Sequence, residues 1–590
     1  MPFVILLSKS GLLAKFCLSF GMTSFLLAIL TLAGCHHQSR GLGPPTAAVP
    51  REPGKTPVSA YQHYLTAQYH LFRGELDDAV AAYKAASQVD PASVQLATEL
   101  AALLVRQGEL TEALANLEKA ISLDPNYLEA HQLLGGLHAG MNQLQEATAQ
   151  YEKIIVLDPN NQEAVIFLAT LHAQQKNYVR ATTLLKNLLK KEPGHFIAQF
   201  YLGKIYLERG QLAEARKEFR QALELRPDFL PAMLEMGTAY ELENQFPRAL
   251  VWYRKVLQID PQNLRAMASQ GRIYLRTRRH AEAAKVFNAI KTIGKSEPET
   301  PFKIGLLYFE QGYFDDAIRE FREVLASRKG PEQVRFFLGA ALEEKGDLAA
   351  AQREYEQISS QSESYIPARL RLAILLARQQ KPAQGIKVLQ DALVLFPQQA
   401  ELYLALAALH EENRDFAKAI ATLQQALEQG VNPVEVNFRL AIIYEKKKEP
   451  EESQRYIAKV LELEPNNPEA LNFLGYMYAV QGKDLAEAER LIQAALALKP
   501  EAGYIIDSLG WVYYKKALYD QAIIYLEQAH AKMPNDATIA EHLGDVYLKK
   551  FRFQDALRLY RKALTLNNPN VNELRRKIKY LEGLLQGMPL

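Results

Sequence analysis

Small apolar residues recur along this chain at a fixed interval, each within a segment whose hydrophobic spacing predicts a helix. Thirteen of them stand 34 positions apart, from Ala67 to Gly475, and Gly510 and Gly544 continue the series after one inserted residue. The members between these ends are Ala101, Gly135, Ala169, Gly203, Gly237, Gly271, Gly305, Gly339, Ala373, Ala407 and Ala441. A period in this range predicts stacked copies of one supersecondary unit.

One copy shows how the unit is built. Leu202, Gly203 and Tyr206 lie three or four residues apart, which places them on one face of a first helix. Gly210 interrupts this helix, and Phe219 lies on the apolar face of a second helix. Because a small residue lets two helix backbones approach closely, Gly203 and Phe219 predict a tightly packed helical pair.

The second helix and the turn after it keep the same period. Small residues mark the second helix of each copy: Ala79, Ala113, Ala147, Ala181, Ala215, Ala249, Ala283, Ala317, Ala351, Gly385, Ala419, Ser453, Ala488, Ala522 and Ala556. Prolines, which cannot continue a helix, close many copies: Pro91, Pro125, Pro159, Pro193, Pro227, Pro261, Pro397, Pro465, Pro500 and Pro534. The seventh to ninth copies lack this proline, so the sequence defines their turns less well.

These features resemble the tetratricopeptide repeat, a 34-residue helix–turn–helix unit with small residues in both helices, an aromatic residue and a late proline. The resemblance covers residues 58–568. It implies an all-α fold, a right-handed α-α superhelical solenoid of about fifteen such units. We divide the array into an N-terminal part, residues 58–330, and a C-terminal part, residues 331–568.

Residues 569–590 are predicted to form a capping helix and tail, which cover the last open apolar face of the array. The apolar stripe of this helix is Leu574, Ile578, Leu581 and Leu585. Its basic residues, Arg575, Arg576 and Lys577, are expected to face the solvent.

The first 34 residues differ from the repeats and are predicted to form an export signal. Lys9 and Lys15 precede a stretch, Phe16–Gly34, that is almost wholly apolar. The ending Leu32-Ala33-Gly34-Cys35 resembles the bacterial lipobox. That resemblance implies cleavage before Cys35 and lipidation of its thiol. The alternative is an uncleaved transmembrane helix, because the apolar run is long enough to span a bilayer.

Residues 35–57 are rich in proline and glycine and are predicted to form a flexible tether between the membrane and the array. Among enterobacterial lipoproteins, Asp at the second position of the mature chain retains the protein at the inner membrane. This chain has His36 there. The resemblance therefore implies an outer-membrane lipoprotein facing the periplasm, with inner-membrane anchoring as the alternative.

The charge of the chain limits its possible partners, and its cysteine content limits its possible disulfides. The chain has 69 basic and 67 acidic residues, and removal of Lys9 and Lys15 with the signal makes the mature chain formally neutral. A neutral array has no general attraction for nucleic acid. The only cysteines are Cys17 and Cys35, so we expect no disulfide in the mature chain.

No catalytic constellation is recognisable in the sequence. There is no glycine-rich phosphate loop after a strand, and no stretch outside the repeats is long enough for a catalytic domain. We therefore expect a protein that is not an enzyme and that has no cofactor and no metal. A glycosyltransferase-like enzyme is the least favoured alternative.

Three groups of residues resemble binding sites but have simpler interpretations. Four histidines occupy a slot that tyrosine fills in other copies, so they are expected to pack between helices: His70, His138, His172 and His410. The pair His36-His37 is a poor metal site on a flexible tether. Five arginines of the seventh copy form either a patch for an acidic partner or an ordinary solvated face: Arg265, Arg272, Arg276, Arg278 and Arg279.

The last three complete copies carry the candidate partner-binding residues. In tetratricopeptide repeats the first helix of each unit lines a concave groove, and the matching positions here combine aromatic and polar side chains: Asn472, Tyr476, Tyr504, Asp507, Trp511, Tyr514, His542 and Asp545. Ordinary packing with a solvated rim is the alternative. The run from Leu471 to Leu548 resembles the C-terminal portion of Gram-negative repeat lipoproteins. Repeated groove Lys and Asn residues, typical of clamps for a C-terminal carboxylate, are missing.

Together these patterns predict a membrane-anchored scaffold. We expect it to bind other proteins or peptide segments of the cell envelope, to reach the membrane through its N-terminal lipid, and to bind no nucleic acid. The alternative is a periplasmic component of a polysaccharide, pilus or outer-membrane-protein export machine.

Overall fold

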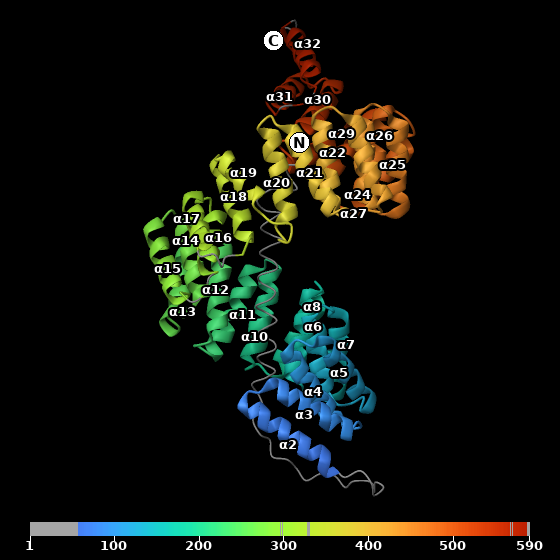
Figure 1. The fold of residues 1–590 in the computed structure, drawn as a ribbon. Helices are drawn as coiled ribbons and strands as arrows, with labels where there is room; N and C mark the ends of the chain where they lie inside the picture. The colour runs from blue at the N-terminus through green and yellow to red at the C-terminus, as the bar shows by residue number, and fades with distance from the viewer. Residues whose placement is uncertain are drawn as a thin grey trace. The chain divides into compact units, whose positions relative to one another are not determined.

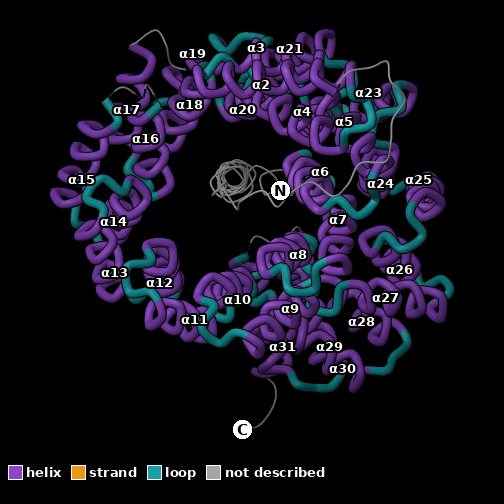
Figure 2. The backbone as a smooth tube through the Cα atoms, turned by 90° about the horizontal axis from the view of Figure 1, so that it is seen from below, coloured by secondary structure: helices purple, strands orange, loops and turns teal. Residues whose placement is uncertain are grey.

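The computed structural model describes residues 57–295, 297, 299–326, 331–566, 568 and 570–586. Within these ranges the regular structure consists of helices joined by short loops, without strands, as Figure 2 shows. The expected signal, Cys35, His36-His37 and the tether up to residue 56 lie outside them. No helix of the described ranges has the length and apolar character needed to cross a membrane.

The chain divides into two compact units between Tyr313 and Phe314. The described helices of the first unit are α2 (Pro57–Arg73), α3 (Leu76–Val89), α4 (Val94–Gln107), α5 (Leu110–Leu123), α6 (Leu128–Gly140), α7 (Leu144–Leu157), α8 (Gln162–Gln174), α9 (Tyr178–Lys191), α10 (Phe196–Glu208), α11 (Leu212–Leu225), α12 (Leu230–Leu242), α13 (Phe246–Ile259), α14 (Leu264–Arg276), α15 (His280–Ile293) and α16 (Thr300–Glu310).

The second unit continues the same alternation of helices. Its described helices are α17 (Phe314–Ala326), α18 (Gln333–Lys345), α19 (Leu348–Glu356), α20 (Tyr365–Arg378), α21 (Pro382–Leu395), α22 (Ala400–Glu412), α23 (Phe416–Glu428), α24 (Pro433–Lys446), α25 (Pro450–Leu463), α26 (Pro468–Gln481), α27 (Leu485–Leu498), α28 (Gly503–Lys515), α29 (Tyr519–Lys532), α30 (Ala537–Lys549), α31 (Phe553–Thr565) and α32 (Val571–Gln586).

The helices pack in pairs, and the pairs stack. Within each unit a first helix lies against its second helix, and that second helix lies against the next first helix, as α10, α11 and α12 do in Figure 1. The small residues of the 34-residue series lie at the pair contact. A Cβ on Gly203 of α10 would lie 2.6 Å from Cε1 of Phe219 on α11, closer than real Cβ atoms approach. The expected close pairing of these two residues is confirmed.

The turn inside each pair follows a rule of its own. Seven positions after every member of the small-residue series, the backbone has a positive φ. Glycine meets this requirement without strain, as at Gly210. Elsewhere the position holds a larger residue, such as Arg278, Ala517 or Phe551, with φ near 60°. Positive φ is therefore a property of the repeat and not a mark of one special site.

The copies without the closing proline are the irregular ones. Helix α19 ends at Glu356 after nine residues, and α20 begins only at Tyr365. The connecting residues, 357–364, are mostly polar. At the end of the array α32 packs on α31 and buries Leu574 and Leu581 completely, as expected of the capping helix.

Candidate interaction surfaces

The predicted groove residues lie on three first helices of the second unit. Asn472 and Tyr476 lie on α26, and His542 and Asp545 lie on α30. The other four, Tyr504, Asp507, Trp511 and Tyr514, lie on α28, which packs against both α26 and α30. The 34-residue period thus brings side chains from three copies onto adjoining helices.

Trp511 is the centre of a stack of rings. Its indole stacks on Tyr514, with 4.7 Å between ring centroids, and on His542 of the next first helix at 4.0 Å. Tyr476 lies 6.3 Å from the ring of His542. Because two parallel rings cover the indole, Trp511 contributes an edge rather than an open face to this surface.

A buried ion pair holds this stack in place. Nδ1 of His542 lies 3.0 Å from Oδ2 of Asp507, and both side chains are buried. Burial alone lowers the pKa of His542, but the carboxylates around it, Asp507 first and then Asp545 and Glu541, together raise that pKa above its ordinary value. His542 is therefore fixed by Asp507 on one side and by Trp511 on its ring face.

Asp545 accepts hydrogen bonds from side chains of the last two helices, α31 and α32. Its carboxylate accepts a hydrogen bond from the Tyr560 hydroxyl at 2.6 Å and from Nζ of Lys577 at 2.7 Å. Lys577 also donates to Glu541 at 2.8 Å. The expectation that Lys577 faces the solvent was wrong: three side-chain partners in α30 and α31, including the Tyr560 ring, surround its ammonium group. Arg575 and Arg576 are exposed as expected.

The remaining predicted residues differ in exposure. Tyr504 is 40% exposed, and its hydroxyl lies 3.4 Å from Glu469. Oδ1 of Asn472 and Nε1 of Trp511 are buried and have no hydrogen-bond partner among the described residues. A buried polar atom without a partner costs on the order of 1–3 kcal/mol. These two atoms are the unsatisfied polar groups among the eight predicted groove residues, and helical spacing does not predict them.

Elsewhere, ion pairs join the first helix of one helical pair to the first helix of the next. Glu343 of α18 accepts hydrogen bonds from Arg371 and Arg378 of α20 at 3.1 and 3.2 Å. Glu411 of α22 pairs in the same way with Arg439 of α24. Charges on these first helices are therefore partly neutralised by the array itself.

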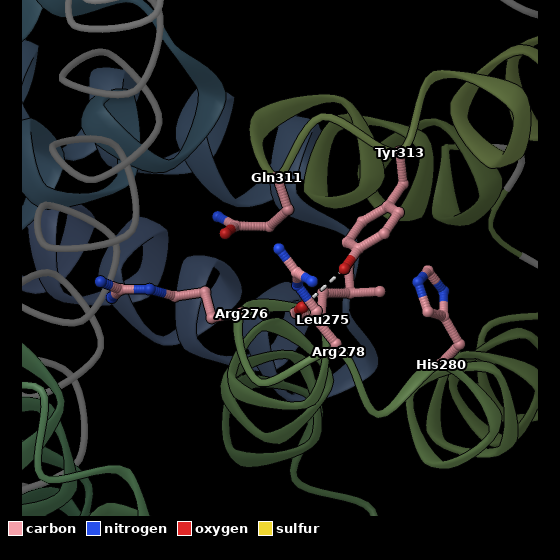
Figure 3. A pocket seen from close by; sticks show the side chains of 6 residues that line it. All are labelled: Leu275, Arg276, Arg278, His280, Gln311 and Tyr313. Carbon is pink, nitrogen blue, oxygen red and sulfur yellow. Dashed lines mark hydrogen bonds between the residues drawn. The ribbon is translucent and has the colours of Figure 1, made fainter.

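The five arginines of the seventh copy fall into two groups, one paired with glutamates and one not. Three of the five arginines donate to glutamates at 2.7–2.8 Å: Arg265 to Glu235, Arg272 to Glu241 and Arg279 to Glu282. Arg276 and Arg278 instead line a hollow of about 620 Å³ between the α14–α15 turn and the end of α16, shown in Figure 3. The other lining residues are Leu275, His280, Gln311 and Tyr313.

The four histidines of the shared slot differ in their surroundings: Nδ1 of His138 lies 2.7 Å from Oε1 of Gln143, whereas Nδ1 of His172 has no hydrogen-bond partner among the described residues. His172 and His410 are buried between helices, and burial lowers the pKa of both. Nδ1 of His70 lies 2.7 Å from Glu75, and Asp78 brings a further carboxylate near this pair. Because Arg73 already pairs with Glu75, the cluster is partly neutralised and makes a weak cation site.

Comparison with solved structures finds other repeat proteins. A tetratricopeptide repeat protein from Parabacteroides merdae is 21% identical over 42% of this chain and 99% of that chain, with a TM-score of 0.38. The structure of Naa15/Naa10 bound to HypK-THB is 15% identical over 90% and 97% of the two chains, with a TM-score of 0.38. Yeast Tom70 is 14% identical over 89% and 96%, with a TM-score of 0.37.

Sequence comparison gives the family. No curated protein matches the sequence significantly. One profile of the tetratricopeptide repeat matches residues 64–127, 234–298, 302–363, 370–431 and 508–571. A second profile of the same repeat matches residues 104–171, 140–199, 172–239 and 411–475. The first profile alone matches more than half of the chain, and the chain therefore belongs to the tetratricopeptide-repeat family.

Proposed function

We propose that this protein is a membrane-anchored scaffold that binds segments of other proteins during assembly of cell-envelope complexes. Repeat arrays of this kind bind partners along extended surfaces and need no catalytic group. The proposal places the binding surface on α26, α28 and α30, around the ring stack of Trp511, Tyr514 and His542. The lipid anchor at Cys35 and the outer-membrane location are parts of the same proposal.

The observation that carries the proposal is the combination of a rigid ring stack with two unsatisfied polar atoms. Aromatic side chains that are already fixed lose little entropy on binding, which is typical of binding hot spots. Nε1 of Trp511 lacks an acceptor and Oδ1 of Asn472 lacks a donor. Both atoms are buried, so a bound segment reaches them only after the two side chains turn toward the surface. A peptide backbone then supplies both groups, a carbonyl and an N–H.

The test begins with crosslinking and pull-down from native envelope to identify a partner. Binding of that purified partner is then compared between Trp511→Phe and Trp252→Phe. Trp511→Phe keeps a ring in the stack but removes the N–H group, and we expect it to weaken binding about fivefold or more, the value of one hydrogen bond. Trp252 of α13 lies outside the proposed surface, so its variant is expected to bind like the wild type. Equal binding by both variants would remove Trp511 from the surface.

The anchor needs a separate test, because Cys35 lies outside the described residues. Cells that express the wild type are expected to incorporate a fatty-acid label into this protein and to retain it in the outer-membrane fraction. Cys35→Ala is expected to carry no label. Equal labelling of the two chains would contradict lipidation at Cys35, and label in the inner-membrane fraction would favour the other membrane.

A further inference from the structure

The hollow beside the α14–α15 turn carries positive charge that no described residue pairs with. The side chain of Arg278 has no hydrogen bond or ion pair among the described residues. This residue lies in the turn after α14, with a backbone φ of 59°. Arg276 donates to Oδ1 of Asn244 at 2.9 Å, a neutral acceptor, and lies over the Phe246 ring. Within the described ranges neither guanidinium is paired with a carboxylate, in contrast to Arg265, Arg272 and Arg279.

The walls of the hollow are fixed. The Tyr313 hydroxyl donates to the backbone carbonyl of Leu275 at 2.9 Å, which joins the end of α16 to the end of α14. The His280 ring meets the Tyr313 ring edge to face, with 4.1 Å between centroids. In Figure 3 the side chains of Arg278 and Gln311 extend into the same space, and Arg276 extends away from them. A bound group would thus meet the guanidinium and the amide beside a wall of two rings that is already in place.

The size and charge of the hollow favour a small anionic group on a peptide over a long polyanion. A polyanion needs a continuous row of cations, but three of the five arginines in this region are engaged by glutamates. A volume of about 620 Å³ suits one or two side chains. The planar guanidinium of Arg278 matches a carboxylate, which accepts two parallel hydrogen bonds from it. The Gln311 amide supplies a further donor, and Leu275 and Tyr313 give the hollow an apolar side.

We propose that this hollow is a second binding site, separate from the groove of α26, α28 and α30, and that it takes an acidic peptide segment. One Asp or Glu carboxylate binds Arg278 and Gln311, and Arg276 attracts a further acidic residue at the mouth. The site does not depend on the groove proposal, because no residue is shared between them.

The test measures binding of a fluorescent peptide of alternating Gly and Glu residues by anisotropy, at low and physiological salt, to the full array. A peptide with Gln in place of Glu is the uncharged probe. We expect the wild type to bind the Glu peptide and not the Gln peptide. Arg278→Gln is expected to weaken binding about tenfold, the effect of losing one charge-assisted hydrogen bond. Gln311→Glu, which places a negative charge in the hollow, is expected to abolish it.

Arg279→Gln is the matched control, because it removes the same charge from the same turn but from a residue already paired with Glu282. It is expected to change binding by less than twofold. Equal loss in Arg278→Gln and Arg279→Gln would mean attraction by net charge, and equal binding of the Gln peptide would mean an apolar site. Tighter binding of sulfated polysaccharide than of peptide, weakened by all five arginine substitutions, would mean a polyanion surface. Each of these results overturns the proposal, as does no binding by a wild type whose helicity is intact.

Discussion

Gly135 of α6 lies so close to Tyr151 of α7 that a Cβ on this glycine would stand 2.8 Å from the ring carbon Cε2. The next residue, Gly136, belongs to the same helix but has no atom within 4 Å of the equivalent position. Two adjacent glycines therefore have different reasons to be small. Gly135 makes room for a neighbouring ring, and nothing in the packing requires Gly136.

We predict that alanine has opposite effects at these two positions. Gly135→Ala forces the Tyr151 ring to move and is expected to destabilise the α6–α7 pair by about 1–3 kcal/mol. Gly136→Ala lowers the conformational entropy of the unfolded chain and is expected to stabilise α6 by up to about 1 kcal/mol. Hydrogen exchange of the α6 and α7 amides measures both changes in stability locally, since each helical pair of a solenoid contacts only its neighbours.

A double variant checks the cause. Where the series has alanine at Ala101 and Ala169, the facing second-helix residues are the aliphatic Leu117 and Leu185, both fully buried. Tyr151→Leu is therefore expected to recover much of the stability lost in Gly135→Ala. If the double variant is as unstable as the sum of its two changes, steric conflict with the Tyr151 ring is not the reason.

Periodicity predicts contacts inside a helical pair better than contacts between distant copies. The spacing of Gly203 and Phe219 predicts their contact, because both positions recur with the helices that carry them. It contains no information on the partner of Lys577, whose acidic neighbours Glu541 and Asp545 lie 36 and 32 residues away. An apolar stripe identifies the buried face of α32, but a lysine at the edge of that stripe faces either solvent or a carboxylate.

The candidate groove shows the same limit. The series places Trp511 on the first-helix face, and the structure has it there. Its stacking on Tyr514 and His542 depends on side-chain rotamers, which helical spacing does not define. The positive φ of the turn was detectable in principle, since Gly74, Gly108 and Gly210 share its position, but larger residues in other copies hide the rule.

That rule gives a second prediction, at the α28–α29 turn. Ala517 is held at φ 60°, a conformation that costs a residue with a Cβ about 1–2 kcal/mol. Glycine removes this strain but adds freedom to the unfolded chain. Ala517→Gly is therefore expected to raise local stability by about 0.5–1 kcal/mol, measured by hydrogen exchange of α28 and α29.

Ala531 in the exposed last turn of α29 is the control for that change. Its backbone is helical, so Ala531→Gly is expected to destabilise the helix by up to about 1 kcal/mol. Destabilisation by both substitutions would show that the φ of Ala517 imposes no cost.

The third prediction concerns pH and the Asp507–His542 pair. Because Asp507 raises the pKa of His542 in the folded chain, the protonated form stabilises the fold. This contribution is complete below the unfolded pKa of about 6.5 and is lost as pH rises through the higher folded value. We expect the urea midpoint of the α28–α30 region to fall as the pH rises from the unfolded pKa of His542 through its folded pKa. Trp511 fluorescence, measured in a Trp252→Phe background, reports it because His542 stacks on this indole.

Asp507→Asn provides the comparison. Without the carboxylate the strongest influence that raises the pKa of His542 is lost, so this pKa is expected to fall and the fluorescence transition to move to lower pH. A transition at the same pH in both chains would assign the titration to another group. His542→Asn is expected to abolish the transition.

The fourth prediction separates buried from exposed ion pairs within the second unit. Glu343 is almost fully buried, and the Tyr355 hydroxyl, Arg371 and Arg378 all donate to it. Glu343→Ala removes the carboxylate that pairs with the buried Arg371 and leaves only the weaker attraction of Glu344, so we expect the α18–α20 contact to lose about 3–5 kcal/mol. Asp315 and Lys345 form an exposed pair, and Asp315→Asn is expected to cost less than about 1 kcal/mol because water screens both charges. Hydrogen exchange of α18 and α20 measures both variants. Similar losses of stability in the two variants would mean that burial adds little to the ion pairs between α18 and α20. Apolar packing alone would then hold these two helices together.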